Sequence, residues 1–199
     1  MCLPHRDLAT PVSAAGALVL VVGPSGAGKD TLMAAGRAGL VGDPRFRFAR
    51  RLITRPAMAG AEEHDSCDGA RFREAEARGE LALSWRAHGL SYGIPAAELS
   101  GIAEGAVVLA NVSRTVIAAA ERLAARVVVL NITAPVAVLA QRLAARGRES
   151  EADIAARLKR EASLTTGRAE IVTIMNDRSV AEAAQELLAM LRGLARQGS

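Results

Sequence analysis

Short apolar runs alternate with amphipathic stretches along most of the chain. The first run, ALVLVV at residues 17–22, has no polar position, which is typical of a parallel strand buried on both faces. Similar runs lie at residues 107–110, 127–132 and 171–175. Helical spacing of apolar positions occurs at residues 29–37, 115–124, 135–145, 152–161 and 180–191. Strands that alternate with helices predict a three-layer α/β fold, in which helices cover both faces of a central parallel sheet.

The stretch from about residue 50 to residue 100 breaks this alternation. It holds a loop with glycine, acidic residues and histidine, a short helical pattern near residues 72–78, and a strand-like LALSW followed by YG. We predict a small inserted lobe here, within a single domain that spans residues 17–192. Residues 1–16 show no periodicity and are expected to form a flexible tail, and residues 193–199 a second tail.

Composition narrows the class of protein. No apolar run approaches the roughly 20 residues that a membrane helix needs, so we expect no membrane partner. The two cysteines form no zinc or disulfide pattern, which favours a cytoplasmic protein. A net charge of +4 would suit nucleic acid, but aromatic residues are only 3% of the chain. Stacking platforms for bases are therefore scarce, and we expect no nucleic-acid partner.

The segment after the first strand predicts a phosphate-binding loop. In the usual pattern G-x-x-x-x-G-K-[ST], Gly23, Gly28 and Lys29 are in register, and Asp30 replaces the Ser or Thr. Backbone N–H groups and the following helix N-terminus make such a loop an anion site. We expect Lys29 to reach the β- and γ-phosphates of ATP and Thr31 to lie near the α-phosphate. The nucleotide-binding residues are then Gly23, Pro24, Ser25, Gly26, Ala27, Gly28, Lys29, Asp30 and Thr31.

Asp30 raises the question of whether the loop still works. A carboxylate about 4 Å from a phosphate charge is repelled by roughly 1 kcal/mol in water and about 4 kcal/mol at an effective dielectric of 20. A bridging Mg²⁺ turns this repulsion into two attractions, and carboxylate oxygen suits Mg²⁺. We therefore predict that Asp30 is a metal ligand and that ATP and Mg²⁺ are the cofactors. The alternative is an exposed Asp30 beside the metal, with Thr31 as the ligand.

Motifs along nearly the whole chain resemble those of the guanylate kinase family. Besides the loop sequence GPSGAGK, they are TRP at residues 54–56, the YG pair at 92–93, RLAARGRESEADIAARL at 142–158 and the ND pair at 176–177. The resemblance implies a P-loop kinase fold in which about residues 142–158 form an arginine-bearing lid.

The same resemblance implies roles for individual residues. Arg142, Arg146 and Arg157 would close from the lid and act with Lys29 in catalysis, and Asn176 would contact the nucleotide. Guanylate kinase-like domains also occur as non-catalytic interaction modules, which lose the loop lysine and the lid arginines. Because this chain keeps them, we favour an enzyme, with the interaction module as the alternative.

Departures from the guanylate kinase pattern bear on the acceptor. Leu83 stands where that family has the glutamate that reads guanine, and His64 replaces a tyrosine. Asn111 and Ser113 replace an acidic pair after the middle strand. A leucine cannot accept hydrogen bonds from guanine, so GMP is not the expected acceptor. The phosphate-reading residues are retained, namely Arg51, Arg55 and Tyr92.

A second set of motifs resembles the ribose 1,5-bisphosphate phosphokinase family. These are GKD at residues 28–30, LITR at 52–55, LALSW at 81–85, HGLSYG at 88–93 and NVSR at 111–114. The resemblance implies ATP-dependent conversion of ribose 1,5-bisphosphate to 5-phospho-D-ribosyl 1-diphosphate in phosphonate catabolism; a guanylate kinase, or a kinase of another small phosphate, is the alternative. The implied acceptor-binding residues are Arg51, Arg55, His64, Leu83, Tyr92, Asn111, Ser113 and Arg114.

Such a reaction needs little from the protein beyond positioning and charge. The attacking group is a phosphate oxygen that is already anionic, so no general base is required. His64 and His88 have no third metal ligand at useful spacing, and we expect polar or substrate-contacting roles for them. Trp85 is expected to pack within the small lobe. The sequence leaves a monomer and a homodimer open.

Overall fold

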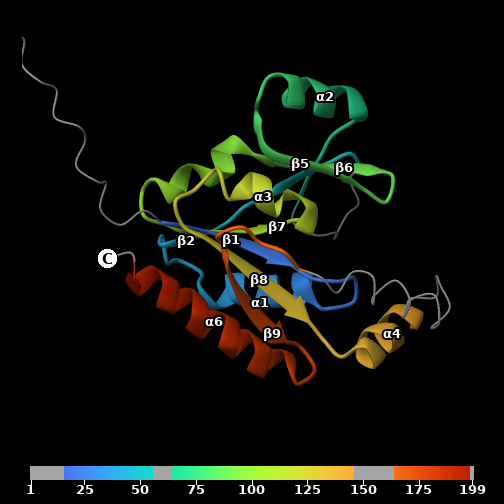
Figure 1. The fold of residues 1–199 in the computed structure, drawn as a ribbon, viewed down its shortest axis with the longest axis vertical. Helices are drawn as coiled ribbons and strands as arrows, with labels where there is room; N and C mark the ends of the chain where they lie inside the picture. Colours follow the sequence, from blue (N-terminus) through green and yellow to red (C-terminus); the bar gives the residue numbers. More distant parts are fainter. Residues whose placement is uncertain (1–15, 56–63, 146–163, 198–199) are drawn as a thin grey trace, which may run out of the picture.

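The computed structural model describes residues 16–55, 64–145 and 164–197 (Figure 1). The strands are β1 (Ala17–Val22), β2 (Phe46–Phe48), β3 (Arg51–Ile53), β4 (His64–Ser66), β5 (Leu81–Ala87), β6 (Leu90–Pro95), β7 (Val107–Asn111), β8 (Val127–Thr133) and β9 (Glu170–Met175). The helices are α1 (Lys29–Gly39), α2 (Gly69–Ala77), α3 (Ile117–Ala120), α4 (Val136–Ala144) and α6 (Val180–Gln197), with 3₁₀ segments η1 (Ala96–Ile102) and η2 (Arg114–Val116).

The central sheet has the strand order β2-β7-β1-β8-β9, and all of its pairs are parallel. Figure 1 shows α1 and α6 on one face, with α3 and the smaller sheet on the other. The predicted three-layer α/β fold is therefore confirmed. Because the strands are parallel, the ends of β1, β7 and β8 meet at one edge, where ligands bind in such sheets.

Strand β1 explains why its sequence has no polar position. Successive side chains point to opposite faces of the sheet. Val19 and Val21 belong to the core that β1 shares with α1, α4 and α6, whereas Leu18 and Leu20 belong to a second core on the other face. Both faces are covered, so every position of the strand is buried.

The predicted inserted lobe forms a second sheet of order β4-β3-β6-β5, with α2 beside it. It is not a separate folding unit. Leu83 and Trp85 of β5 and Ile94 of β6 lie in the same buried cluster as Leu18 and Leu20 of β1. The lobe and the central sheet therefore share one hydrophobic core.

Two sequence predictions on helices need correction. The expected helix at 115–124 is only η2 and the four-residue α3, followed by turns. After α3 the backbone bonds reach back three residues, from Arg122 N to Ala119 O (3.1 Å) and from Leu123 N to Ala120 O (2.9 Å), so the chain turns and the α-helical ladder ends. The Arg168 guanidinium then donates to Ala124 O (2.6 Å) and Ala125 O (3.0 Å). The expected tail from residue 193 is also wrong, because α6 runs to Gln197 and buries Leu194.

The helical pattern predicted at residues 152–161 falls outside the described part of the chain. Within the described residues, no helix has both the length and the apolar character needed to cross a membrane.

Candidate active site

The phosphate loop joins β1 to α1 at the carboxyl edge of the central sheet. Gly28 has φ +84°, and a Cβ there would lie 2.4 Å from Nδ2 of Asn176. Gly23 has φ +148°, and its Cβ would lie 1.9 Å from the carbonyl oxygen of Ile132. Both conformation and space therefore require glycine at the two positions that the motif fixes.

Asn176 and Arg142 brace the phosphate loop. The sequence analysis predicts a nucleotide contact for Asn176 and a catalytic role for Arg142. Asn176 is 4% exposed and donates from Nδ2 to Ala27 O at 2.8 Å. Arg142, in the last turn of α4, donates to Asn176 O at 3.0 Å and to Gly26 O at 3.4 Å. Neither residue lines the two cavities described below. The structure thus gives Asn176 a bracing role on the loop backbone, and its predicted contact with the nucleotide stays a prediction.

Lys29 begins α1 and holds its ammonium against the loop. Nζ donates to Gly23 O at 2.8 Å and to Pro24 O at 3.0 Å. The side chain lines both cavities of the site. The ammonium therefore lies beside the loop backbone and borders both cavities, and its contact with the β- and γ-phosphates stays a prediction.

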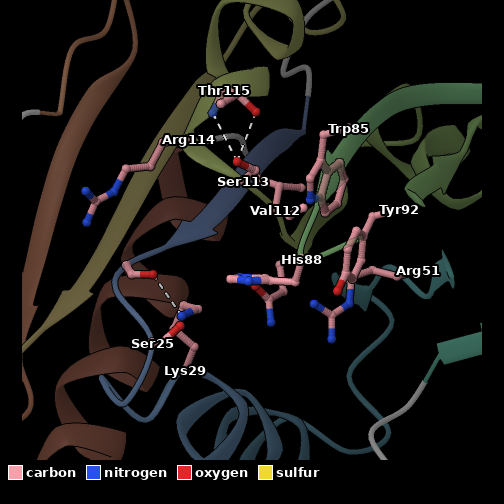
Figure 2. A pocket seen from close by; sticks show the side chains of 13 residues that line it. Ser25, Lys29, Arg51, Trp85, His88, Tyr92, Val112, Ser113, Arg114 and Thr115 are labelled. Carbon is pink, nitrogen blue, oxygen red and sulfur yellow. Dashed lines mark hydrogen bonds between the residues drawn. The ribbon is translucent and has the colours of Figure 1, made fainter. Parts of the chain in front are cut away.

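The first cavity, of about 460 Å³, lies between the phosphate loop and the small lobe (Figure 2). Three segments that are far apart in the sequence enclose it: the loop with Lys29, the lobe, and the chain that follows β7. Its lining residues are Gly23, Ser25, Lys29, Arg51, Trp85, Ala87, His88, Tyr92, Asn111, Val112, Ser113, Arg114 and Thr115. Five of the predicted acceptor residues are among them: Arg51, Tyr92, Asn111, Ser113 and Arg114.

Two aromatic rings form one wall of the first cavity. Trp85 and Tyr92 are paired across β5 and β6, and their rings stack with centroids 5.4 Å apart and planes 7° from parallel. Trp85 is 8% exposed. The prediction that it packs within the lobe is confirmed, but its ring also faces the cavity, which the sequence did not reveal.

His88, for which we predict a polar or substrate-contacting role, lines both cavities. It lies in the turn between β5 and β6 with φ +50°, followed by Gly89 with φ +74°. Figure 2 shows its imidazole between the Lys29 side and the Arg51 side of the cavity. The HG pair between two strand-like segments marks this turn in the sequence, since a two-residue hairpin of type I′ has positive φ at both central residues.

The second cavity, of about 320 Å³, adjoins the helix side of the loop. It is lined by Ser25, Gly26, Gly28, Lys29, Asp30, Thr31, Arg51, Ile53, Arg55, His88, Tyr92 and Asn111. Six residues line both cavities: Ser25, Lys29, Arg51, His88, Tyr92 and Asn111. The two cavities therefore adjoin along a border that carries the cations Lys29 and Arg51.

The segment after β7 supplies polar groups to the first cavity. Asn111, the last residue of β7, is 7% exposed, and its Nδ2 donates to Oδ1 of Asp30 at 2.9 Å. The Ser113 hydroxyl accepts from the backbone N–H of Thr115 at 3.3 Å and from its hydroxyl at 2.9 Å. The predicted residues Asn111, Ser113 and Arg114 are thus brought together at one wall.

Two predicted acceptor residues lie elsewhere. Leu83 is 3% exposed, pairs with Ile94 across the strands and belongs to the shared core. His64 pairs with Arg51 in the parallel β3–β4 ladder. Neither lines either cavity, so the structure contradicts direct contact for Leu83, whose side chain is enclosed by other apolar groups. Of the lid cations, Arg146 and Arg157 fall outside the described residues.

The donor set can be compared with the needs of Mg²⁺. Among the described residues, no group of three or more His, Cys, Asp or Glu side chains gathers as a metal cage. Mg²⁺ in phosphotransferases is commonly held by one or two carboxylates together with substrate phosphates and water. Asp30, in the lining of the second cavity beside the phosphate loop, fits that mode.

Comparison with known proteins places the chain. No protein-family model matches it. The ribose 1,5-bisphosphate phosphokinase PhnN of Methylobacterium radiotolerans is 54% identical over 177 residues, which cover 89% of this chain and 98% of that protein. The protein of the same name from Brucella melitensis is 52% identical, over 90% and 94% of the two chains.

A solved structure agrees on the fold. The guanylate kinase of Anaplasma phagocytophilum superposes with a TM-score of 0.63 at 18% identity, covering 91% of this chain and 87% of that one. At this sequence identity, the likeness supports the P-loop kinase fold and carries no conclusion about activity. Since the curated relatives match over nearly their whole length at about half identity, the chain belongs to the ribose 1,5-bisphosphate phosphokinase family.

Proposed function

We propose that this protein transfers the γ-phosphoryl group of ATP to ribose 1,5-bisphosphate and forms 5-phospho-D-ribosyl 1-diphosphate, as part of phosphonate catabolism. The observation that carries the proposal is the pair of adjoining cavities, one on the phosphate loop and one between the loop and the lobe. Lys29 and Arg51 line both of them. A nucleotide phosphate and an acceptor phosphate can therefore meet between these two cations.

In the proposed step, an oxygen of the anomeric phosphate attacks the γ-phosphorus. A new P–O bond forms, the bond from the γ-phosphorus to the β–γ bridging oxygen breaks, and ADP leaves with that electron pair. The nucleophile is anionic at neutral pH, so no proton has to be removed. The protein supplies orientation and positive charge, which are the main terms in phosphoryl transfer.

The lining residues suggest how the acceptor is oriented. Arg51 and Arg55 from the β3 side, and Arg114 from the segment after β7, offer guanidinium groups that bind phosphate in a bidentate manner. The stacked Trp85–Tyr92 wall offers an apolar surface of the kind that suits the C–H face of a ribose ring. These side chains together match a sugar with a phosphate at each end.

Asp30 and Thr31 are the proposed residues for the cation that accompanies ATP. Mg²⁺, when bound, neutralises charge on the β- and γ-phosphates. We further propose that Arg142, Arg146 and Arg157 contribute charge from the lid side of the nucleotide. Because the reaction consumes ATP, the proposal also favours a cytoplasmic location.

The test is a coupled assay of ADP formation with ribose 1,5-bisphosphate, ribose 5-phosphate and GMP as acceptors. Ribose 1,5-bisphosphate is expected to be used best. Ribose 5-phosphate should be poor, because its anomeric hydroxyl would need a general base. A rate on GMP above the rate on ribose 1,5-bisphosphate would favour a guanylate kinase. Absence of ADP with every acceptor would favour an interaction module.

A further inference from the structure

The hydrogen bond between Asn111 and Asp30 joins two elements that are distant in the sequence. Asp30 lies in the first turn of α1, and Asn111 ends β7. The donor is fixed by the sheet: Asn111 is 7% exposed, pairs in parallel register with Val21, and is followed by a bond from Val112 N to Val21 O at 3.1 Å. The hydrogen-bond acceptor, the Asp30 side chain, is in contrast exposed on the helix.

An amide donor at this place has a specific effect on the carboxylate. It engages Oδ1 at 2.9 Å and so restricts the rotation of the group, but it adds no charge. An arginine or lysine in its position would offset the negative charge that a cation ligand needs. Asn111 therefore orients the Asp30 carboxylate without itself adding a charge that opposes it.

The orientation of the Asp30 carboxylate matters because the second cavity has few acidic side chains. Among the described residues that line the second cavity, Asp30 is the single acidic side chain. A cation bound there would take its other ligands from phosphate and water, and its position would depend on that one carboxylate. Groups that hold a metal ligand in place are commonly worth 10- to 100-fold in metal affinity.

We infer that Asn111 is a positioning residue that holds the Asp30 carboxylate over the second cavity for the divalent cation that accompanies the nucleotide. The inference rests on the proposed use of ATP. It gives Asn111 a role in binding the phosphoryl donor, ATP with its cation, in addition to any contact with the sugar phosphate.

The first test measures ADP binding by calorimetry, with Mg²⁺ and with EDTA, and with no acceptor present. Asn111→Ala should leave the affinity in EDTA within about twofold and lower the affinity in Mg²⁺ about 10-fold. Asn131→Ala is the control, because Asn131 is an asparagine of the neighbouring strand β8, registered with Val22 of β1, and lines neither cavity. It should change neither affinity.

The second test exchanges the amide and the carboxylate between Asn111 and Asp30. Asn111→Asp alone brings two carboxylates together, and should alter the Mg²⁺ dependence strongly. Adding Asp30→Asn restores one amide and one carboxylate across the same contact, so the double variant should recover much of the Mg²⁺-dependent affinity. Recovery in the double variant is not expected if the two residues act independently.

Two results would overturn the inference. Equal losses in Mg²⁺ and in EDTA for Asn111→Ala would make Asn111 a support for the loop only, and no loss in either would give it no role. Because acceptor is absent, neither result bears on ribose 1,5-bisphosphate. Conversely, normal Mg²⁺-ADP binding without turnover of that sugar would reject the proposed acceptor and leave the Asn111 role standing.

Discussion

The phosphate loop and the β5–β6 hairpin enclose the same cavities by different means. The loop presents backbone, and its shape depends on glycines at positive φ and on bracing by Asn176 and Arg142. The hairpin presents side chains, and its cavity face depends on a cross-strand aromatic pair. Damage to the loop should therefore disturb every nucleotide reaction, whereas damage at Trp85, which lines the first cavity but not the second, should disturb the acceptor.

Lys29→Ala is the most severe test of the loop. Its ammonium is the loop's contribution of charge to both cavities, and loss of a preorganised electrostatic contact typically costs 10²- to 10³-fold in turnover. We expect at least that loss in kcat with all acceptors, measured by ADP release. Arg45→Ala, which removes an exposed ion pair with Asp43, is the control and should be neutral. Retention of most activity in Lys29→Ala would contradict the nucleotide site.

Gly28→Ala tests whether the loop acts through its backbone. The new Cβ would meet Asn176 Nδ2 at 2.4 Å, so the loop has to move. We expect ADP affinity to fall about 10²-fold and stability to fall by about 1–3 kcal/mol. Gly42→Ala separates strain from collision, because Gly42 has φ +80° with nothing within 4 Å of its Cβ position. It should lose stability but keep ADP affinity; equal ADP affinities in the two variants would contradict the bracing by Asn176.

Trp85→Leu tests the hairpin. Tyr92 would lose its stacking partner, a contact worth about 0.5–1.5 kcal/mol beyond area burial, and the first cavity would lose part of its wall, so the KM for ribose 1,5-bisphosphate should rise about 10-fold. Because Trp85 does not line the second cavity, the KM for ATP should change little. Leu83→Ala is the control. It should destabilise the fold by about 2–5 kcal/mol without changing the acceptor KM in the folded fraction, because Leu83 is in the core. A larger KM change for Leu83→Ala than for Trp85→Leu would restore Leu83 as an acceptor contact.

The smallest expected effect concerns acid stability away from both regions. The pKa of Glu121 is lowered from its ordinary 4.5 chiefly by the backbone N–H of Ala169, with the N–H groups of Arg168 and Gly167 adding to it. A depressed pKa in the folded state gives stability above pH 4.5 that is lost as the pH falls through the folded value. The melting temperature of Glu121→Gln should therefore be lower than wild type near neutral pH and should converge with it in acid. A constant difference at all pH values would contradict this.

Local features of the chain could be predicted, and contacts between distant segments could not. The strand β1 and the glycines of the loop follow from apolar pattern and backbone conformation, which are local properties. The Asn176 brace and the Asp30–Asn111 bond join residues that are 149 and 81 positions apart, so no spacing rule could reveal them. The resemblance placed Leu83 by alignment, but strand pairing buried it opposite Ile94. The carbonyls that follow the short α3 bind Arg168, more than 40 residues further along the chain.

The hydrophobic core shared by β1 and the lobe limits how acceptor specificity can change, both by engineering and in evolution. Leu83, Trp85 and Ile94 pack in one cluster with Leu18 and Leu20. A chimera that imports the lobe of another kinase would place foreign side chains against an unchanged β1, at a cost typical of overpacked or underpacked cores. New acceptor specificity therefore cannot be grafted as a cassette. It would have to arise through paired changes in the strand that carries the nucleotide loop and in the lobe that receives the sugar.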